Sequence, residues 1–164
     1  MVSEAVKIGA YVMYGKTGVC LIKEKTTMSG GQYYVLAPIS DSRSSVYVPC
    51  DNAELVARML PLLTVEEIDG LLSCADEVRL TWIDDRNERG MLYRTILGGG
   101  DRKELIRLLC CLMRKKVERL EIGKRLSTMD ENVLQECVRL VQEEFSMVLG
   151  IDKSEVGPYI QERL

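Results

Sequence analysis

The feature that most constrains the fold of this chain is a change in its hydrophobic period close to residue 50. Before it, apolar and polar side chains alternate in short runs that glycines and serines separate. Alternation with a period of two is typical of half-buried β-strands. Strands are therefore expected at 10–14, 18–22, 32–36 and 45–48, with a hairpin turn at 29–31. Short strands in so little chain predict a small β-barrel, too small to hold a ligand cavity.

After residue 50 the apolar side chains recur every three or four residues, as in amphipathic helices. Asp51 with Glu54, and Thr64 with Glu67, have the spacing of capping pairs that begin helices. Glycines separate the later runs at Gly98–Gly100, Gly123 and Gly150, and the first of these breaks precedes an expected N-cap at Asp101. Further helices are expected at roughly 80–97, 101–120, 128–149 and 155–163.

Two of these helices carry apolar stripes that should pack against each other. The first stripe consists of Leu105, Leu108, Leu109, Leu112 and Met113. The second consists of Val133, Leu134, Cys137, Val138, Val141, Phe145, Val148 and Leu149. The sequence thus predicts an α+β protein, with a β-barrel domain at 1–55 and an all-α domain of about five helices at 56–164.

The residue types argue against enzymatic chemistry. The chain has no histidine, which excludes Ser-His and Cys-His catalysis and His-ligated zinc. Its six cysteines form no Cys-x-x-Cys pair that would begin a zinc or redox site. Gly15-Lys-Thr-Gly18 lacks the spacing of a phosphate loop. We expect no catalytic residue, no cofactor, no metal and no small-molecule substrate.

Compartment and charge point to a soluble protein with an anionic partner. No run of apolar residues is long enough for a membrane span and no leader segment opens the chain, so we expect a cytoplasmic protein. The net charge is only −3, yet residues 85–125 carry an excess of positive charge between two acidic segments. Such asymmetry indicates nucleic acid as a partner, although a solvated helix face produces the same pattern.

An ordered series of motifs resembles a known family. The N-terminal part contains Lys7-Ile-Gly9, Val12-x-Tyr14, Gly18-Val-x-x-Ile22, Tyr34-Val-Leu36 and Val48-Pro-x-x-Asn52-Ala. This order is similar to the polymerase-interacting module shared by CarD, CdnL and transcription-repair coupling factors. The C-terminal part contains Trp82, Arg89, Ile96-Leu-x-x-Gly-Asp101, the 105–114 helix, Leu126-Ser127 and Glu143-Glu144. These residues resemble the helical domain of CarD and CdnL, which the coupling factors lack.

The resemblance implies a Tudor-like or SH3-like barrel that binds the RNA polymerase β subunit, and a helical domain that contacts promoter DNA at the upstream edge of the melted region. In the barrel, the strand ending in Pro49 resembles the family strand that lies along the polymerase, and a terminal proline suits a sheet edge. The expected polymerase contacts are Val46, Tyr47, Val48 and Pro49, with Lys25 and Met28 as flanking contacts on the neighbouring strand.

Trp82 is the only tryptophan. By itself it would be expected to pack in the core, but the resemblance implies a wedge in the minor groove. Arg86 and Arg89 follow it by four and seven residues, which on a helix places both on its side, where they would neutralise phosphates. The alternative is an ordinary exposed ladder with Asp85 and Glu88.

The densest basic stretch consists of Arg114, Lys115, Lys116, Arg119, Lys124 and Arg125. Phosphate contacts from these residues would make DNA binding strongly salt-dependent. A solvated helix end, where the helix dipole favours cations, explains the same residues.

The sequence therefore predicts a regulator, not an enzyme, that binds RNA polymerase and stabilises the promoter open complex through weakly sequence-specific contacts to the minor groove and phosphate backbone. Through the polymerase it would be nucleoid-associated. The alternative is an adaptor whose helical domain recruits another protein. A solvent-exposed Trp82 beside Arg86 and Arg89 would favour DNA, and a buried Trp82 would favour the adaptor.

Overall fold

The α+β class is confirmed: a sheet is followed by helices. The computed structural model describes residues 6–75, 77 and 79–164. The chain divides into two compact units that meet between Leu63 and Thr64. This division falls later than the expected 55/56 boundary, because the last strand of the sheet follows that position.

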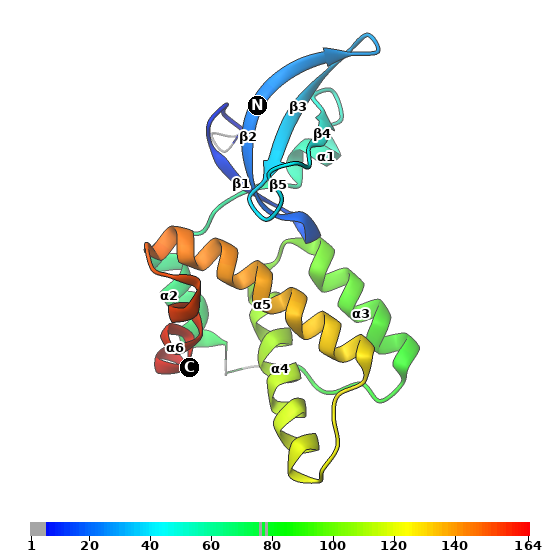
Figure 1. Ribbon diagram of the computed structural model, residues 1–164, viewed down its shortest axis with the longest axis vertical. Helices are drawn as coiled ribbons and strands as arrows, with labels where there is room; N and C mark the ends of the chain where they lie inside the picture. The colour runs from blue at the N-terminus through cyan, green and yellow to red at the C-terminus, as the bar shows by residue number, and fades with distance from the viewer. Residues whose placement is uncertain (1–5, 76, 78) are drawn as a thin grey trace. The chain divides into compact units, whose positions relative to one another are not determined.

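The first unit is a five-stranded antiparallel sheet with the strand order β4-β3-β2-β1-β5 (Figure 1). The strands are β1 (Tyr11–Tyr14), β2 (Gly18–Met28), β3 (Gly31–Pro38), β4 (Val46–Pro49) and β5 (Met59–Pro61). A 3-10 turn (Gly15–Thr17) joins β1 to β2, and the short helix α1 (Ala53–Ala57) precedes β5. Strands β4 and β5 are the two edges of the sheet.

The core of this unit comes from one face of the alternating strands. Val12, Cys20, Ile22, Leu36 and Val48 have no exposed surface. Burying such aliphatic side chains is the main favourable contribution to folding of a unit this small.

Strand β2 continues past the expected end at residue 22 through six largely polar residues. Its partner β3 supplies hydrogen bonds along that length, up to the pair Met28 and Gly31. The turn between them has Ser29 and Gly30 at positive φ, 48° and 81°, as two-residue hairpin turns require. The predicted hairpin turn is thus confirmed. The polar side chains of residues 23–28 gave no sign that β2 continues, because its backbone hydrogen bonds to β3 extend it.

Two local predictions at the end of the first unit were wrong. The N-cap of α1 is Asn52 and not Asp51, since the Asn52 side chain accepts a hydrogen bond from the Leu55 amide. The fifth strand, β5, was not expected. It is only three residues long and ends in Pro61, so its sequence shows little alternation of polar and apolar residues. It is a strand because it pairs with β1.

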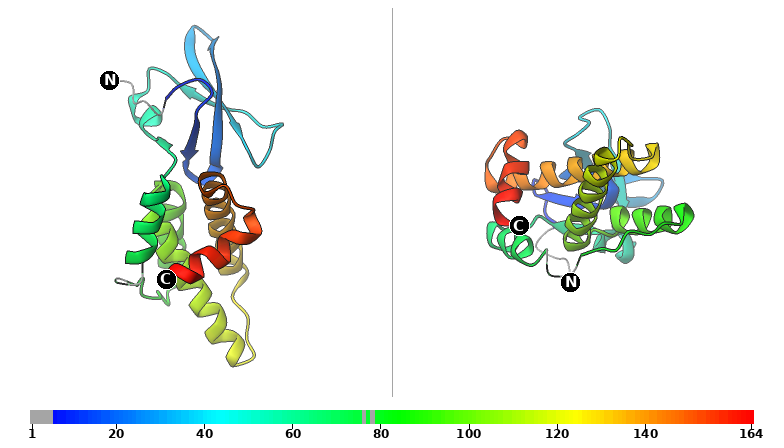
Figure 2. Two further views of the ribbon diagram at one scale, coloured as in Figure 1. Left: turned by 90° about the vertical axis from the view of Figure 1, so that its left-hand side faces the viewer. Right: turned by 90° about the horizontal axis from the view of Figure 1, so that it is seen from below.

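The second unit contains five helices within the residues that the structure describes. They are α2 (Val65–Cys74), α3 (Arg86–Gly99), α4 (Arg102–Glu121), α5 (Thr128–Leu149) and α6 (Lys153–Arg163). Helix α5 contacts each of the other four, and α2 and α6 lie side by side (Figures 1 and 2). The predicted capping box of Thr64 with Glu67 is confirmed at the start of α2.

Helix α3 begins at Arg86, later than the expected start near residue 80. Asp85 caps it by accepting a hydrogen bond from the Glu88 amide, and residues 79–85 are not helical. At its other end Gly100 adopts φ 75°, the left-handed conformation that ends helices, and Asp101 caps α4 as predicted. Trp82 therefore lies in a connecting segment and not on a helix.

The two predicted apolar stripes meet between α4 and α5. Leu105, Leu108 and Leu112 are buried on α4, and Leu134, Cys137, Val141 and Phe145 are buried on α5. Met113 departs from the prediction, because 43% of its surface is exposed. Among the described residues, no helix has the length and apolar character needed to cross a membrane.

Candidate functional site

The indole of Trp82 lies between two cations in the helical unit. The guanidinium carbon of Arg89 is 4.6 Å from the ring centroid, and Nζ of Lys115 is 5.0 Å from it. Cations at this distance from an aromatic face are held by its quadrupole. The side chain is half-buried. Trp82 is therefore neither a core residue nor fully exposed, an arrangement between the two outcomes expected for DNA binding and for an adaptor.

Arg89 is buried, and its guanidinium is hydrogen-bonded to groups of the protein. Only 7% of its surface is exposed. Its Nε donates to Oδ1 of Asp130 at 2.9 Å and its Nη2 donates to Oδ2 at 3.1 Å, a bidentate pair. Its Nη1 donates to the carbonyl oxygens of Ile83 and Asp84 at 3.0 and 3.1 Å. Arg89 thus joins α3, α5 and the segment that carries Trp82.

Asp130 is the acceptor at the centre of this network. Besides Arg89, the Tyr93 hydroxyl donates to its Oδ1 and the Ser127 hydroxyl donates to its Oδ2, both at 2.6 Å. Burial acts to raise the pKa of Asp130, but the hydrogen bonds from Arg89, Ser127 and Tyr93 outweigh it and hold the pKa below its ordinary value. The carboxylate is therefore ionised and fully hydrogen-bonded.

The two partners of Asp130 respond in the opposite direction. The hydrogen bond to Asp130 is the main cause that raises the pKa of Arg89. Burial, with the neighbouring carboxylate, raises the pKa of Tyr93 well above its ordinary value. Both groups therefore keep their protons at neutral pH, and the network stays intact.

The expectation that Trp82, Arg86 and Arg89 share one face of a helix was wrong, because the helix begins at Arg86. Trp82 nevertheless contacts Arg89, since the segment after Trp82 is tied to the Arg89 guanidinium. Arg86 is exposed in the first turn of α3. A helix N-terminus favours anions, so Arg86 is suitably placed for a phosphate, whereas Arg89 is already bonded to protein groups.

The six residues of the basic stretch do not form one surface. Lys115 contacts the Trp82 ring, and Arg119 follows one turn later on the same side of α4. Lys116 pairs with Glu131 of α5 at 3.1 Å. Arg114 lines a separate pocket between α4, α5 and α6. Lys124 and Arg125 are exposed after the end of α4.

The sequence prediction missed Asp130 and Tyr93, and it named Ser127 only within the motif Leu126-Ser127. A serine three residues before an aspartate was a visible sign of a helix start, and Ser127 does cap α5. The pairing of Asp130 with Arg89 joins residues 41 positions apart and has no periodic signature. Glu144, quoted for the resemblance, likewise is buried and pairs with Arg102 at 3.0 Å.

In the sheet unit, the second candidate site is the edge strand β4, which pairs only with β3 within the described residues. The amide of Cys50 donates to the Gln32 carbonyl. Because hydrogen-bonded positions alternate in an antiparallel pair, Val48 and Val46 bond to β3 while the backbone of Tyr47 points away from it. Pro49, the next outward position, has no N–H to leave unpaired.

The expected polymerase contacts have different environments. Tyr47 is 48% exposed, whereas Val48 is completely buried and belongs to the core. Lys25 and Met28 lie on β2, which β3 separates from β4, so their expected place on the neighbouring strand was wrong. Nζ of Lys25 lies 5.4 Å from the ring centroid of Tyr34 on β3.

Metal binding and cysteine-based catalysis have little support in the described part of the chain. No group of three or more Cys, Asp or Glu side chains lies together where a metal could be held. Burial raises the pKa of the Cys137 thiol to about 12 and also raises that of Cys111, so both are poor nucleophiles.

Comparison with known families gives one match. Residues 6–60 match the model of the CarD-like/TRCF RID domain. This match covers the sheet unit and supports a polymerase-binding role connected with transcription. No curated protein shows a significant sequence match to the chain.

Proposed function

We propose that this chain, whose residues 6–60 belong to the CarD-like/TRCF RID domain family, is a non-catalytic transcription regulator that stabilises the promoter open complex. Its sheet unit binds the RNA polymerase β subunit, and its helical unit contacts DNA at the upstream edge of the melted region. The observation that carries the DNA part is the half-buried indole of Trp82, held between Arg89 and Lys115.

The proposed wedge needs an aromatic ring that is held in place before DNA arrives. Arg89 supports this by binding the two carbonyls that follow Trp82, and Asp130 holds Arg89 in turn. A pre-organised ring loses little conformational freedom on binding. Insertion beside a base step costs stacking energy, which the melted edge of a promoter has already lost in part.

Fewer basic residues are proposed to contact phosphates than the sequence suggests. Arg86, Lys115, Arg119 and the exposed Lys124 and Arg125 are the proposed phosphate contacts. Arg89, Arg114 and Lys116 were expected among them, but Arg89 and Lys116 have ion-pair partners on α5. The minor groove distinguishes bases poorly, so binding is weakly sequence-specific.

The proposed mechanism is differential binding. A factor that binds the open promoter more tightly than the closed one shifts the equilibrium by the difference between those two free energies. Tethering through the sheet unit raises the local concentration of a weak DNA binder. The proposed polymerase contact is the outward edge of β4, where Tyr47 offers a backbone N–H, a carbonyl and an exposed ring.

The test is the lifetime of the open complex on a promoter with the cognate polymerase, without the factor, with wild type and with Trp82→Ala. Polymerase binding is checked separately by pull-down, and Arg94→Gln serves as a control because Arg94 is exposed on α3 and outside the Trp82 network. We expect wild type and the control to lengthen the lifetime and Trp82→Ala to lose the effect while still binding polymerase.

A wild-type protein that binds polymerase without changing the lifetime would contradict the proposal. That outcome would favour the alternative, an adaptor whose helical unit recruits another protein to the polymerase.

A further inference from the structure

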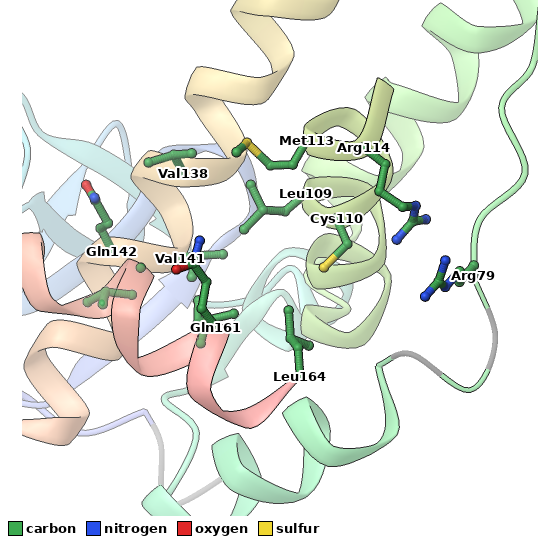
Figure 3. Close-up of a pocket in the computed structure, with 13 residues that line it drawn as sticks. Arg79, Leu109, Cys110, Met113, Arg114, Val138, Val141, Gln142, Gln161 and Leu164 are labelled. Atoms are coloured by element: carbon green, nitrogen blue, oxygen red, sulfur yellow. The ribbon is translucent and has the colours of Figure 1, made fainter. Parts of the chain in front are cut away.

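An apolar pocket of about 410 Å³ lies between α4, α5 and α6 (Figure 3). Leu109 of α4, Val138 and Val141 of α5, and Val156 and Ile160 of α6 line its walls. Small-molecule sites in proteins have volumes of roughly 300–1,000 Å³ and predominantly apolar walls. The pocket therefore has the size and lining of a ligand site.

The charged side chains among the lining residues are basic. Arg79 and Arg114 line it, and none of its lining residues in the described part of the chain is Asp or Glu. Figure 3 shows the guanidinium ends of Arg79 and Arg114 directed toward one another at one side of the pocket. A single guanidinium presents its N–H donors as a planar fork that suits a carboxylate or phosphate, and Arg114 offers such a group at this pocket.

The opposite rim supplies neutral polar groups, the amides of Gln142 and Gln161. Met113 also lines the pocket and is 43% exposed. It is the most exposed member of the predicted α4 stripe. A bound apolar chain would cover part of this side chain and gain the free energy of removing it from water.

We propose that this pocket binds a small amphiphile with an apolar body and an anionic head, of which a medium-chain carboxylate is the simplest example. The apolar body lies along the walls from α5 and α6, and the head pairs with Arg114. This site is separate from the Trp82 network and does not depend on the proposed role in transcription.

Isothermal titration calorimetry of the full chain with decanoate, kept below its micelle-forming concentration, tests the proposal. Decanol and decyltrimethylammonium have the same apolar body with a neutral or a cationic head. We expect saturable 1:1 binding of decanoate, at least about tenfold tighter than that of the cationic analogue. No saturable binding of decanoate, or equal affinity for the cation, overturns the proposal.

Variants locate the site. Arg114→Gln should weaken decanoate binding about fivefold, as expected for a partly exposed ion pair, with little effect on decanol. Met113→Glu places a carboxylate at the exposed rim, where it should repel decanoate without disturbing the fold. Arg94→Gln removes the same charge from α3, outside the pocket, and should bind decanoate like wild type.

A filling variant separates this pocket from other apolar surfaces. Val138→Trp should abolish binding of both decanoate and decanol, and its thermal unfolding is measured to verify that it folds. If Val138→Trp misfolds, decanoate binding by Met113→Glu alone tests whether this pocket is the site. Unchanged decanoate binding in Met113→Glu, or a wild-type dimer that Val138→Trp dissociates while decanoate does not bind, overturns the proposal.

Discussion

Arg89 and Asp130 form a bidentate ion pair between α3 and α5, with N–O distances of 2.9 and 3.1 Å. The Asp130 side chain is 1% exposed and that of Arg89 is 9% exposed. Because Arg89 also binds the carbonyls of Ile83 and Asp84, this pair determines where the Trp82 segment lies. The pair thereby supports the ring that we propose as the DNA contact.

Removing one partner of this pair should destabilise the helical unit strongly. Asp130→Asn leaves a buried guanidinium without its counter-charge, and such changes cost about 3–5 kcal/mol. The free energy of unfolding, measured by urea denaturation, checks this. Arg58→Gln is the control, because its pair with Glu54 is exposed and contributes about 0.3–0.5 kcal/mol. Equal losses in the two variants would contradict the prediction.

The same pair predicts how stability depends on pH. The folded-state pKa of Asp130 lies below the unfolded value of about 3.9. Its contribution to stability is therefore fully present above that value and is lost as the pH falls through the lower folded-state pKa. As the pH falls below about 4, wild type should lose stability more steeply than Asp130→Asn. Parallel curves for the two proteins would show that Asp130 does not titrate in this way.

Trp82 fluorescence should show whether Arg89 holds the indole in its partly buried position. In Arg89→Lys the ammonium cannot bind Asp130 in a bidentate manner and reach both carbonyls, so the indole should become more accessible to a neutral quencher such as acrylamide. We expect a quenching constant about twofold above that of wild type, because a partly buried ring becomes exposed. Arg94→Gln should show wild-type quenching. The measurement needs no polymerase, so it tests the support separately from DNA binding.

The proposed phosphate contacts predict a change in salt dependence. Each lost contact should reduce the slope of log K against log salt by about 0.9 for duplex DNA. Arg86→Gln and Arg119→Gln should each show this reduction in binding to a promoter fragment with a melted region. Lys103→Gln, exposed at the start of α4, should not. A uniform slope in all variants would exclude these two residues as phosphate contacts.

If a strand of the polymerase pairs with the edge strand β4, binding should depend on the backbone N–H of Tyr47. Tyr47→Pro removes the outward N–H, which β3 does not use, so the sheet should persist while a partner strand loses a hydrogen bond. Tyr47→Ala keeps this N–H and removes only the ring. We expect pull-down with the polymerase β subunit to weaken more in Tyr47→Pro than in Tyr47→Ala, with circular dichroism confirming both folds. The reverse order would indicate that the ring carries the contact.

The sequence by itself determined the order and type of most elements. Alternation located the first four strands, and the cap residues Thr64 and Asp101 marked helix starts, because both signals depend on residues close together in the sequence. The motifs of the first fifty residues indicated the family of the sheet unit, which the match over residues 6–60 supports.

Only the tertiary structure decided what the functional residues contact. Trp82 and Arg89 were expected together on a helix, but they meet because Asp130, 41 residues further along, holds the guanidinium under the Trp82 segment. Likewise Met113 fits the buried stripe of α4 by spacing, yet it is 43% exposed and lines a pocket between α4, α5 and α6. Such contacts depend on how helices distant in sequence pack, and local periodicity carries no information about that packing.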